Sequence, residues 1–165
     1  MDFRVGIGFD AHGLAAGRRL VLGGVEVPYD RGLVGHSDGD ALAHAIMDAL
    51  LGAAGLGDKG VHFPPSDPQY KDISSLVLLT KVAGLLAAAG WRISNVDATM
   101  LAQKPRLAPF IPVISCKYPC SVWGSFKAPW TVAGGWWGCR PANPGRNAIS
   151  SLTLGLYFIV QLPRG

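Results

Sequence analysis

The chain has no acidic residue after Asp97, although it holds 11 acidic residues among its 165. Cysteine is also scarce: Cys116, Cys120 and Cys139 have no zinc-ribbon spacing, and pairing two of them would leave one over. We therefore interpret them as free thiols. No run reaches the ~18 consecutive apolar residues of a membrane helix, so no membrane partner is expected.

Targeting signals are also missing at the start of the sequence. Residues 1–5 lead directly into an alternating pattern, without the apolar core of a signal peptide or the Arg/Ser-rich stretch of a transit peptide. This predicts a cytoplasmic protein.

Charge divides the chain in two. Residues 1–97 carry a net charge of −3 and residues 98–165 a net charge of +7. The later basic residues are scattered among Trp, Pro and Gly without a repeat, unlike a nucleic-acid-binding tail. No nucleic-acid partner is therefore predicted.

The length corresponds to one domain, spanning residues 1–165. Alternation predicts strands over residues 3–8 and 91–102, and Gly23-Gly24 predicts a hairpin over 20–27. Helical periodicity covers 38–54 and about 75–89, and another helix is expected to start near Pro109. This alternation favours an α/β or α+β fold, and we take it as α+β, two layers with helices on one face of a sheet. Residues 115–148 show neither periodicity, and 149–160 fit a strand or a short helix.

Four histidines all lie at or before residue 62. Asp10 and His12 are two residues apart near a strand end, which places both side chains on one side. His44 from the following helix would complete three sides of a tetrahedral site, the layout of a catalytic zinc with one open corner. Asp40 and Asp48 lie one turn from His44 and are candidates to accept from its second ring N–H. Asp10 and His12 also fit a surface pair, and a lone helical histidine also fits a core or surface position.

Further polar segments fit a phosphorylated ligand. Residues 36–40 precede a helix N-terminus, where backbone donors meet phosphate, although a capping loop fits equally. Residues 58–60 and 63–67 fit either ligand contacts or plain turns. Residues 103–107 carry two cations around a proline and fit either a nucleotide site or a simple basic connection.

Taken together, these segments resemble the 2-C-methyl-D-erythritol 2,4-cyclodiphosphate synthase family of the non-mevalonate isoprenoid pathway. The matching stretches run from residue 3 to about residue 114: Arg4–His12, Leu22–Tyr29, Gly35–Asp40, Met47–Ala53, Leu56–Asp58, Trp91–Asp97 and Ala102–Leu107.

The resemblance implies a lyase that cyclises 4-diphosphocytidyl-2-C-methyl-D-erythritol 2-phosphate to 2-C-methyl-D-erythritol 2,4-cyclodiphosphate and releases CMP. It implies a homotrimer with active sites at subunit interfaces, and zinc on Asp10, His12 and His44. His36 would be catalytic, stabilising developing charge. The implied substrate-binding residues are Asp10, Ala11, His12, His36, Ser37, Asp58, Lys59, Gly60, Phe63, Pro64, Pro65, Ser66 and Asp67. The cytidine diphosphate part would be bound by a neighbouring subunit through Ala102, Gln103, Lys104, Pro105, Arg106, Leu107 and Ala108.

The last third departs from the family pattern. The family carries a late Lys-Ala-Thr-Thr-x-Glu segment whose glutamate helps hold a second divalent ion, Mg or Mn. Here Lys127-Ala128 is followed by Pro129-Trp130-Thr131, so that glutamate has no candidate. Pro65 also stands where many relatives carry an acid. The abrupt change near residue 115 suggests a shift of reading frame, and the alternative function is a catalytically inactive metal- and phosphate-binding homologue.

Overall fold

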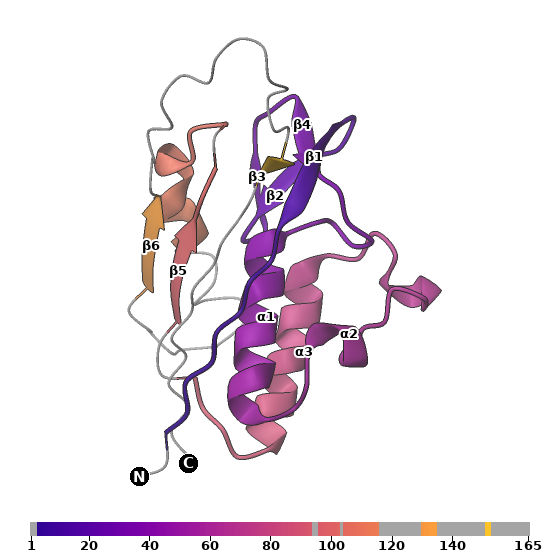
Figure 1. Ribbon diagram of the computed structural model, residues 1–165, viewed down its shortest axis with the longest axis vertical. Helices are drawn as coiled ribbons and strands as arrows, with labels where there is room; N and C mark the ends of the chain where they lie inside the picture. The colour runs from indigo at the N-terminus through magenta and orange to yellow at the C-terminus, as the bar shows by residue number, and fades with distance from the viewer. Residues whose placement is uncertain (1–2, 94–95, 103, 116–129, 135–150, 153–165) are drawn as a thin grey trace.

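The structure is a computed structural model that describes residues 3–93, 96–102, 104–115, 130–134 and 151–152. Helices and strands are mixed (Figure 1), which confirms the predicted α+β class. The strands are β1 (His12–Ala16), β2 (Leu20–Leu22), β3 (Val25–Val27), β4 (Arg31–Leu33), β5 (Val96–Met100), β6 (Trp130–Gly134) and β7 (Ser151–Leu152). The helices are α1 (Ala41–Ala54), α2 (Lys59–His62), α3 (Ser75–Ala88) and the 3-10 turns η1 (Pro68–Tyr70) and η2 (Ala108–Phe110).

The described strands form three small sheets. β1 lies between β4 and β7, antiparallel to both, while β5 and β6 pair in parallel. β2 and β3 form the predicted hairpin, with Leu20 opposite Val27 and positive φ angles at Gly23 and Gly24, as a two-residue turn requires. The strand predicted over residues 91–102 is present as β5, which is shorter. Residues 111–115 continue from η2 as a helix.

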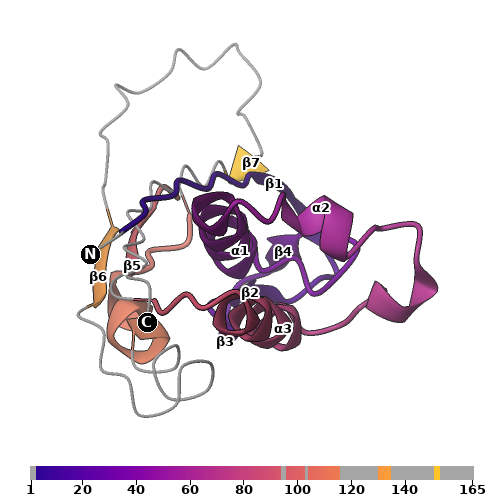
Figure 2. The same cartoon turned by 90° about the horizontal axis from the view of Figure 1, so that it is seen from below.

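Helices α1 and α3 lie side by side and carry most of the core (Figures 1 and 2). α1 is buried on nearly every side, because it also contacts β2 and β5. The largest fully buried side chains are Leu20, Leu22, Leu33, Leu42, Ile46, Met47, Leu50, Leu51, Leu79 and Leu86. This packing fixes the first turn of α1, which is where the candidate site begins.

The start of α1 depends on one buried carboxylate. Asp40 is the N-cap: its Oδ1 accepts from the Ala43 N–H at 3.1 Å and from the Gly23 N–H at 2.9 Å, and its Oδ2 accepts from the Gly24 N–H at 2.6 Å. Burial, followed by the charge of Asp38, raises the pKa of Asp40 to about 6, against the lowering effect of those N–H groups. The predicted helix start at residue 38 was therefore too early. The predicted end was right, with Gly55 in the left-handed conformation at φ 71°.

The strand predicted over residues 3–8 is wrong. These residues lie outside every sheet of the described part, and they run along α1 instead (Figure 1). A Cβ at Gly6 would lie 2.0 Å from the Ala49 carbonyl oxygen, and one at Gly8 would lie 1.9 Å from the Ala45 carbonyl oxygen. The two glycines therefore allow a backbone-to-helix approach that alternation alone does not reveal.

We expect Gly8→Ala to destabilise the protein by about 1–3 kcal/mol, because the added methyl must push the chain away from α1. Urea unfolding followed by circular dichroism measures the change. Gly13→Ala is the matched control, since a Cβ there meets nothing within 4 Å. Equal stability of the two variants would show that residues 3–8 do not pack on the helix as described.

Candidate metal centre

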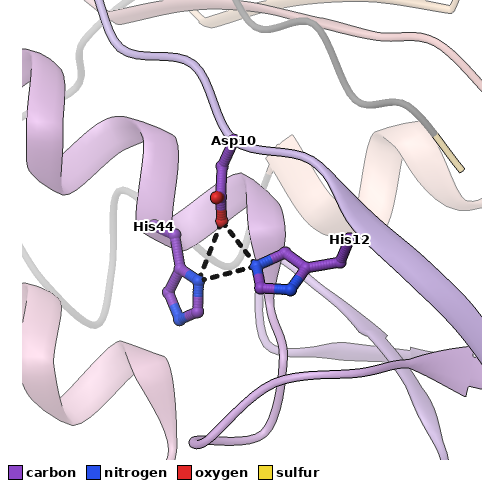
Figure 3. A group of neighbouring side chains, drawn as sticks. All are labelled: Asp10, His12 and His44. Atoms are coloured by element: carbon purple, nitrogen blue, oxygen red, sulfur yellow. Dashed lines mark hydrogen bonds and ion pairs between the residues drawn. The ribbon is translucent and has the colours of Figure 1, made fainter. Parts of the chain in front are cut away.

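The three predicted metal ligands meet at one point (Figure 3). Asp10 lies just before β1, His12 is the first residue of β1, and His44 lies in the first turn of α1. Asp10 Oδ2 is 2.7 Å from His12 Nε2 and 2.9 Å from His44 Nδ1. The two ring nitrogens are 3.3 Å apart. Residues distant in sequence thus form one compact group of potential metal ligands, as the sequence predicted.

The orientation of His12 is set by a backbone carbonyl. Its Nδ1 lies 2.5 Å from the Val34 oxygen, which can only accept a hydrogen bond. The neutral ring therefore carries its hydrogen on Nδ1, which leaves Nε2, the atom that faces Asp10 and His44, available to bind a metal. A backbone carbonyl behind the far ring nitrogen is the usual support of a metal-bound histidine.

The partner predicted for His44 was wrong. Neither Asp40 nor Asp48 accepts from its second ring nitrogen, because Asp40 is used by the backbone N–H groups described above and Asp48 binds Lys59. The His44 Nε2 instead lies 3.0 Å from Ser37 Oγ and 3.0 Å from Ser75 Oγ. Both hydroxyl groups are buried, so Nε2 is held by hydroxyl groups rather than by a carboxylate.

The donor set fits a divalent cation. Two ring nitrogens and a carboxylate oxygen, all with lone pairs directed inward, repel one another unless protons or a cation lie between them. Metal–ligand bonds of about 2.0–2.2 Å in a tetrahedral site place the ligands about 3.3–3.5 Å apart, so the observed separations need to open only slightly. Two nitrogens and one oxygen are typical of catalytic zinc ligands.

The electrostatics also favour a cation. Burial acts to raise the pKa of Asp10, but hydrogen bonds from His12 and His44 and the charge of Lys59 outweigh it and hold the pKa far below its ordinary range. The bond to Asp10 raises the pKa of His12. The Lys59 Nζ lies 3.3 Å from Asp10 Oδ1 and 3.2 Å from Asp48 Oδ2. Oδ1 of Asp10 is thus paired with Lys59, and Oδ2 faces the two histidine rings.

A pocket of about 580 Å³ opens beside this group. Most of the predicted substrate-binding residues line it: Asp10, His12, His36, Ser37, Asp58, Lys59, Gly60, Phe63 and Pro65. His36, the predicted catalytic residue, is exposed at the pocket, whereas Ser37 is buried behind it. Four predicted residues are not part of the lining: Ala11, Pro64, Ser66 and Asp67. Asp67 instead caps η1, where its Oδ1 accepts from the Gln69 N–H at 3.0 Å.

The predicted nucleotide segment does not contribute to the pocket. No described residue of 102–108 is among its lining residues, and Gln103 lies outside the described part. Leu107 is buried in the core, and the Lys104–Pro105 peptide bond is cis. Within one chain, the structure therefore does not bring the described residues of this segment to the metal ligands.

Some lining residues were not predicted as site residues: Met47, Asp48, Tyr70 and Leu78. Asp48 carried a signal, since it follows His44 by one helical turn and so shares its face. Tyr70 stands edge-on to Phe63, with ring centroids 5.5 Å apart, which depends on the turn at η1. Met47 and Leu78 carry only the apolar periodicity of their helices, and periodicity cannot separate core from pocket wall.

The fold and the site define an α+β protein with a two-histidine, one-carboxylate centre in the wall of a pocket. The chain belongs to the YgbB family, whose sequence model matches residues 3–118. That match ends close to the composition break at residue 115. Among the described residues, no helix is long and apolar enough to span a bilayer.

Individual relatives agree with this assignment. Over 108 residues the chain is 68% identical to 2-C-methyl-D-erythritol 2,4-cyclodiphosphate synthase of Syntrophomonas wolfei, covering 66% of this chain and 69% of the relative. The bifunctional IspDF of Campylobacter jejuni matches with a TM-score of 0.81 at 30% identity, covering 99% of this chain and 43% of that one. A CDP-bound form of the synthase matches with a TM-score of 0.78 at 29% identity, covering 97% of this chain and 100% of that one.

Proposed function

We propose that this chain cyclises 4-diphosphocytidyl-2-C-methyl-D-erythritol 2-phosphate to 2-C-methyl-D-erythritol 2,4-cyclodiphosphate, with release of CMP. The observation that carries the proposal is the convergence of Asp10, His12 and His44 in a pocket wall, inside the part of the chain that the synthases match. The reaction is a phosphoryl transfer, in which the substrate's 2-phosphate attacks its β-phosphate. Such a reaction needs positioning and charge neutralisation rather than a protein nucleophile.

We assign zinc to Asp10 Oδ2, His12 Nε2 and His44 Nδ1, and bound zinc would act there as a Lewis acid and template for phosphate oxygens. His36 serves as the donor that stabilises charge as it develops, because it is the exposed imidazole of the pocket outside the ligand group. Ser37 and residues 58–60 hold the erythritol phosphate and its hydroxyls. Residues 63–67 close the same side, with Phe63 and Pro65 in the lining.

The nucleotide part of the substrate is assigned to residues 102–108 of a neighbouring subunit in a homotrimer. Two observations support this. The described residues of this segment are absent from the pocket of their own chain, and the large apolar side chains of Phe3, Val5, Ile7 and Phe9 are each more than half exposed. A row of exposed apolar side chains is typical of a protein–protein interface.

We further propose that residues 1–165 form a single domain and that the protein lies in the cytoplasm. In this proposal, residues 115–165 are atypical because a shift of reading frame has altered their sequence.

A second candidate function is a catalytically inactive homologue that binds metal and phosphate. The observation in its favour is the lack of any acid after Asp97, which removes the glutamate expected to hold a second Mg or Mn ion. The match to the family model also ends at residue 118. This candidate keeps the whole metal centre and pocket described above.

CMP release separates the two candidates. We expect an active enzyme to release CMP from its substrate when Zn²⁺ and Mg²⁺ are present, and a chelator to abolish the release. Light scattering on the same sample is expected to give about three times the 17.4 kDa chain mass. Zinc binding without CMP release would favour the inactive homologue. If the chain neither binds zinc nor releases CMP, both candidates are contradicted.

A further inference from the structure

The buried side of His44 is held by two hydroxyl groups from different elements. Ser37 belongs to the loop before α1, and Ser75 is the first residue of α3. Ser75 is fully buried, and its Oγ also lies 2.5 Å from Asp38 Oδ1. The Ser75 backbone N–H donates to Asp38 Oδ2 at 3.0 Å. Asp38, Ser75 and His44 therefore form one continuous hydrogen-bonded chain that leads to the metal centre.

The direction of this chain follows from its donors and acceptors. A carboxylate only accepts hydrogen bonds, so the single hydroxyl hydrogen of Ser75 is directed to Asp38. The Ser75 oxygen then has only lone pairs to offer to His44, and the hydrogen between them belongs to the His44 Nε2. In the neutral ring, the Nδ1 atom is then left with a lone pair for a metal, and this is the atom that lies 2.9 Å from Asp10 Oδ2.

We propose that Asp38 and Ser75 are positioning residues that make His44 a metal ligand through Nδ1. The proposal rests on the metal centre assigned under the proposed function. Neither residue lines the pocket, so both act through His44 rather than on the substrate. An imidazole whose second nitrogen is fixed by an acceptor is held in one tautomer and one orientation, which strengthens its bond to a metal.

The same contacts explain an irregularity in α3. Ser74 is the N-cap of that helix, yet its side chain makes no capping hydrogen bond. Asp38 takes over by accepting from the Ser75 N–H, which ties the loop of residues 36–38 to the start of α3. The loop assigned to the substrate phosphate and the ligand His44 therefore share one buried junction.

The test compares Ser75→Ala with the matched control Ser74→Ala. The two variants remove the same hydroxyl from adjacent residues, but only Ser75 contacts His44. Zinc affinity is measured by competition with a chromophoric chelator. We expect Ser75→Ala to weaken zinc binding by about 10–100-fold and Ser74→Ala to leave it unchanged. Asp38→Ala is expected to weaken binding as well, because the freed Ser75 hydroxyl can then donate to Nε2.

A spectroscopic readout separates positioning from stability. In the cobalt-substituted protein, the d–d absorption reports ligand geometry, and we expect it to change in Ser75→Ala while Ser74→Ala matches the wild type. Circular dichroism checks that each variant is folded. If wild-type protein binds zinc but Ser75→Ala has the same affinity and cobalt spectrum, the positioning role is refuted and the metal centre stands. If the wild type binds no zinc at pH 7, the proposed metal centre fails, and the positioning role fails with it.

Discussion

Replacing His44 with alanine is expected to reduce bound zinc from about one ion per chain to nearly none, because only two protein ligands remain. Asp10 and His12 come from the same extended segment, whereas His44 is the ligand that α1 brings to them. CMP release, which depends on the ion in the proposed mechanism, is expected to fall with it. Metal analysis after dialysis measures the stoichiometry, and the CMP assay is run on the same samples.

Two other histidines provide the controls for this experiment. His62 is not part of the pocket, and its Nε2 bonds to the Leu56 carbonyl oxygen at 2.7 Å. We expect His62→Ala to keep both zinc and CMP release. His36 lines the pocket but is not in the ligand group, so His36→Ala is expected to keep zinc and lose CMP release. Zinc retained in full by His44→Ala would refute the ligand assignment.

The metal ligands could be predicted because the Asp10–His12 pair and the helical His44 match a family pattern, not because their geometry is local. In the described part of the chain, the strand end expected before Asp10 does not exist, and His12 is instead the first residue of β1. The supports behind them could not be predicted in the same way. The Val34 carbonyl carries no side-chain signal, and Ser75 reaches His44 only because α1 and α3 pack side by side.

Residues 3–8 show the opposite case, in which a clear local pattern misled. Phe3, Val5 and Ile7 alternate there with Arg4 and two glycines, which is the strand pattern, but Gly6 and Gly8 serve a close approach to α1. The side chains that alternate with them are exposed rather than buried. A period-two pattern records which residues share a face, and it does not record whether a neighbouring strand pairs with them.

Replacing Asp40 with alanine is expected to destabilise the protein by about 3–5 kcal/mol, although Asp40 touches neither the pocket nor the metal through its side chain. The side chain is fully buried and accepts from three backbone N–H groups, those of Gly23, Gly24 and Ala43. Alanine removes the N-cap of α1 and leaves the hairpin N–H groups without their acceptor. Burial raises the pKa of Asp40, so the ionised carboxylate carries a desolvation cost that alanine removes, and the expected loss is what remains after that relief.

Thermal unfolding in the presence of a chelator measures this effect without any contribution from zinc, and it is expected to show a fall in Tm of about 10 °C. Asp67→Ala is the matched control, since Asp67 is also an N-cap aspartate but lies outside the core, so its removal should lower the Tm much less. His44 lies one turn after Asp40 on α1, so a loosened helix start should also weaken zinc binding in the Asp40 variant alone. Equal Tm values for the two variants would mean that the β2–β3 hairpin and α1 are held together by apolar packing, and that Asp40 adds only an ordinary helix cap.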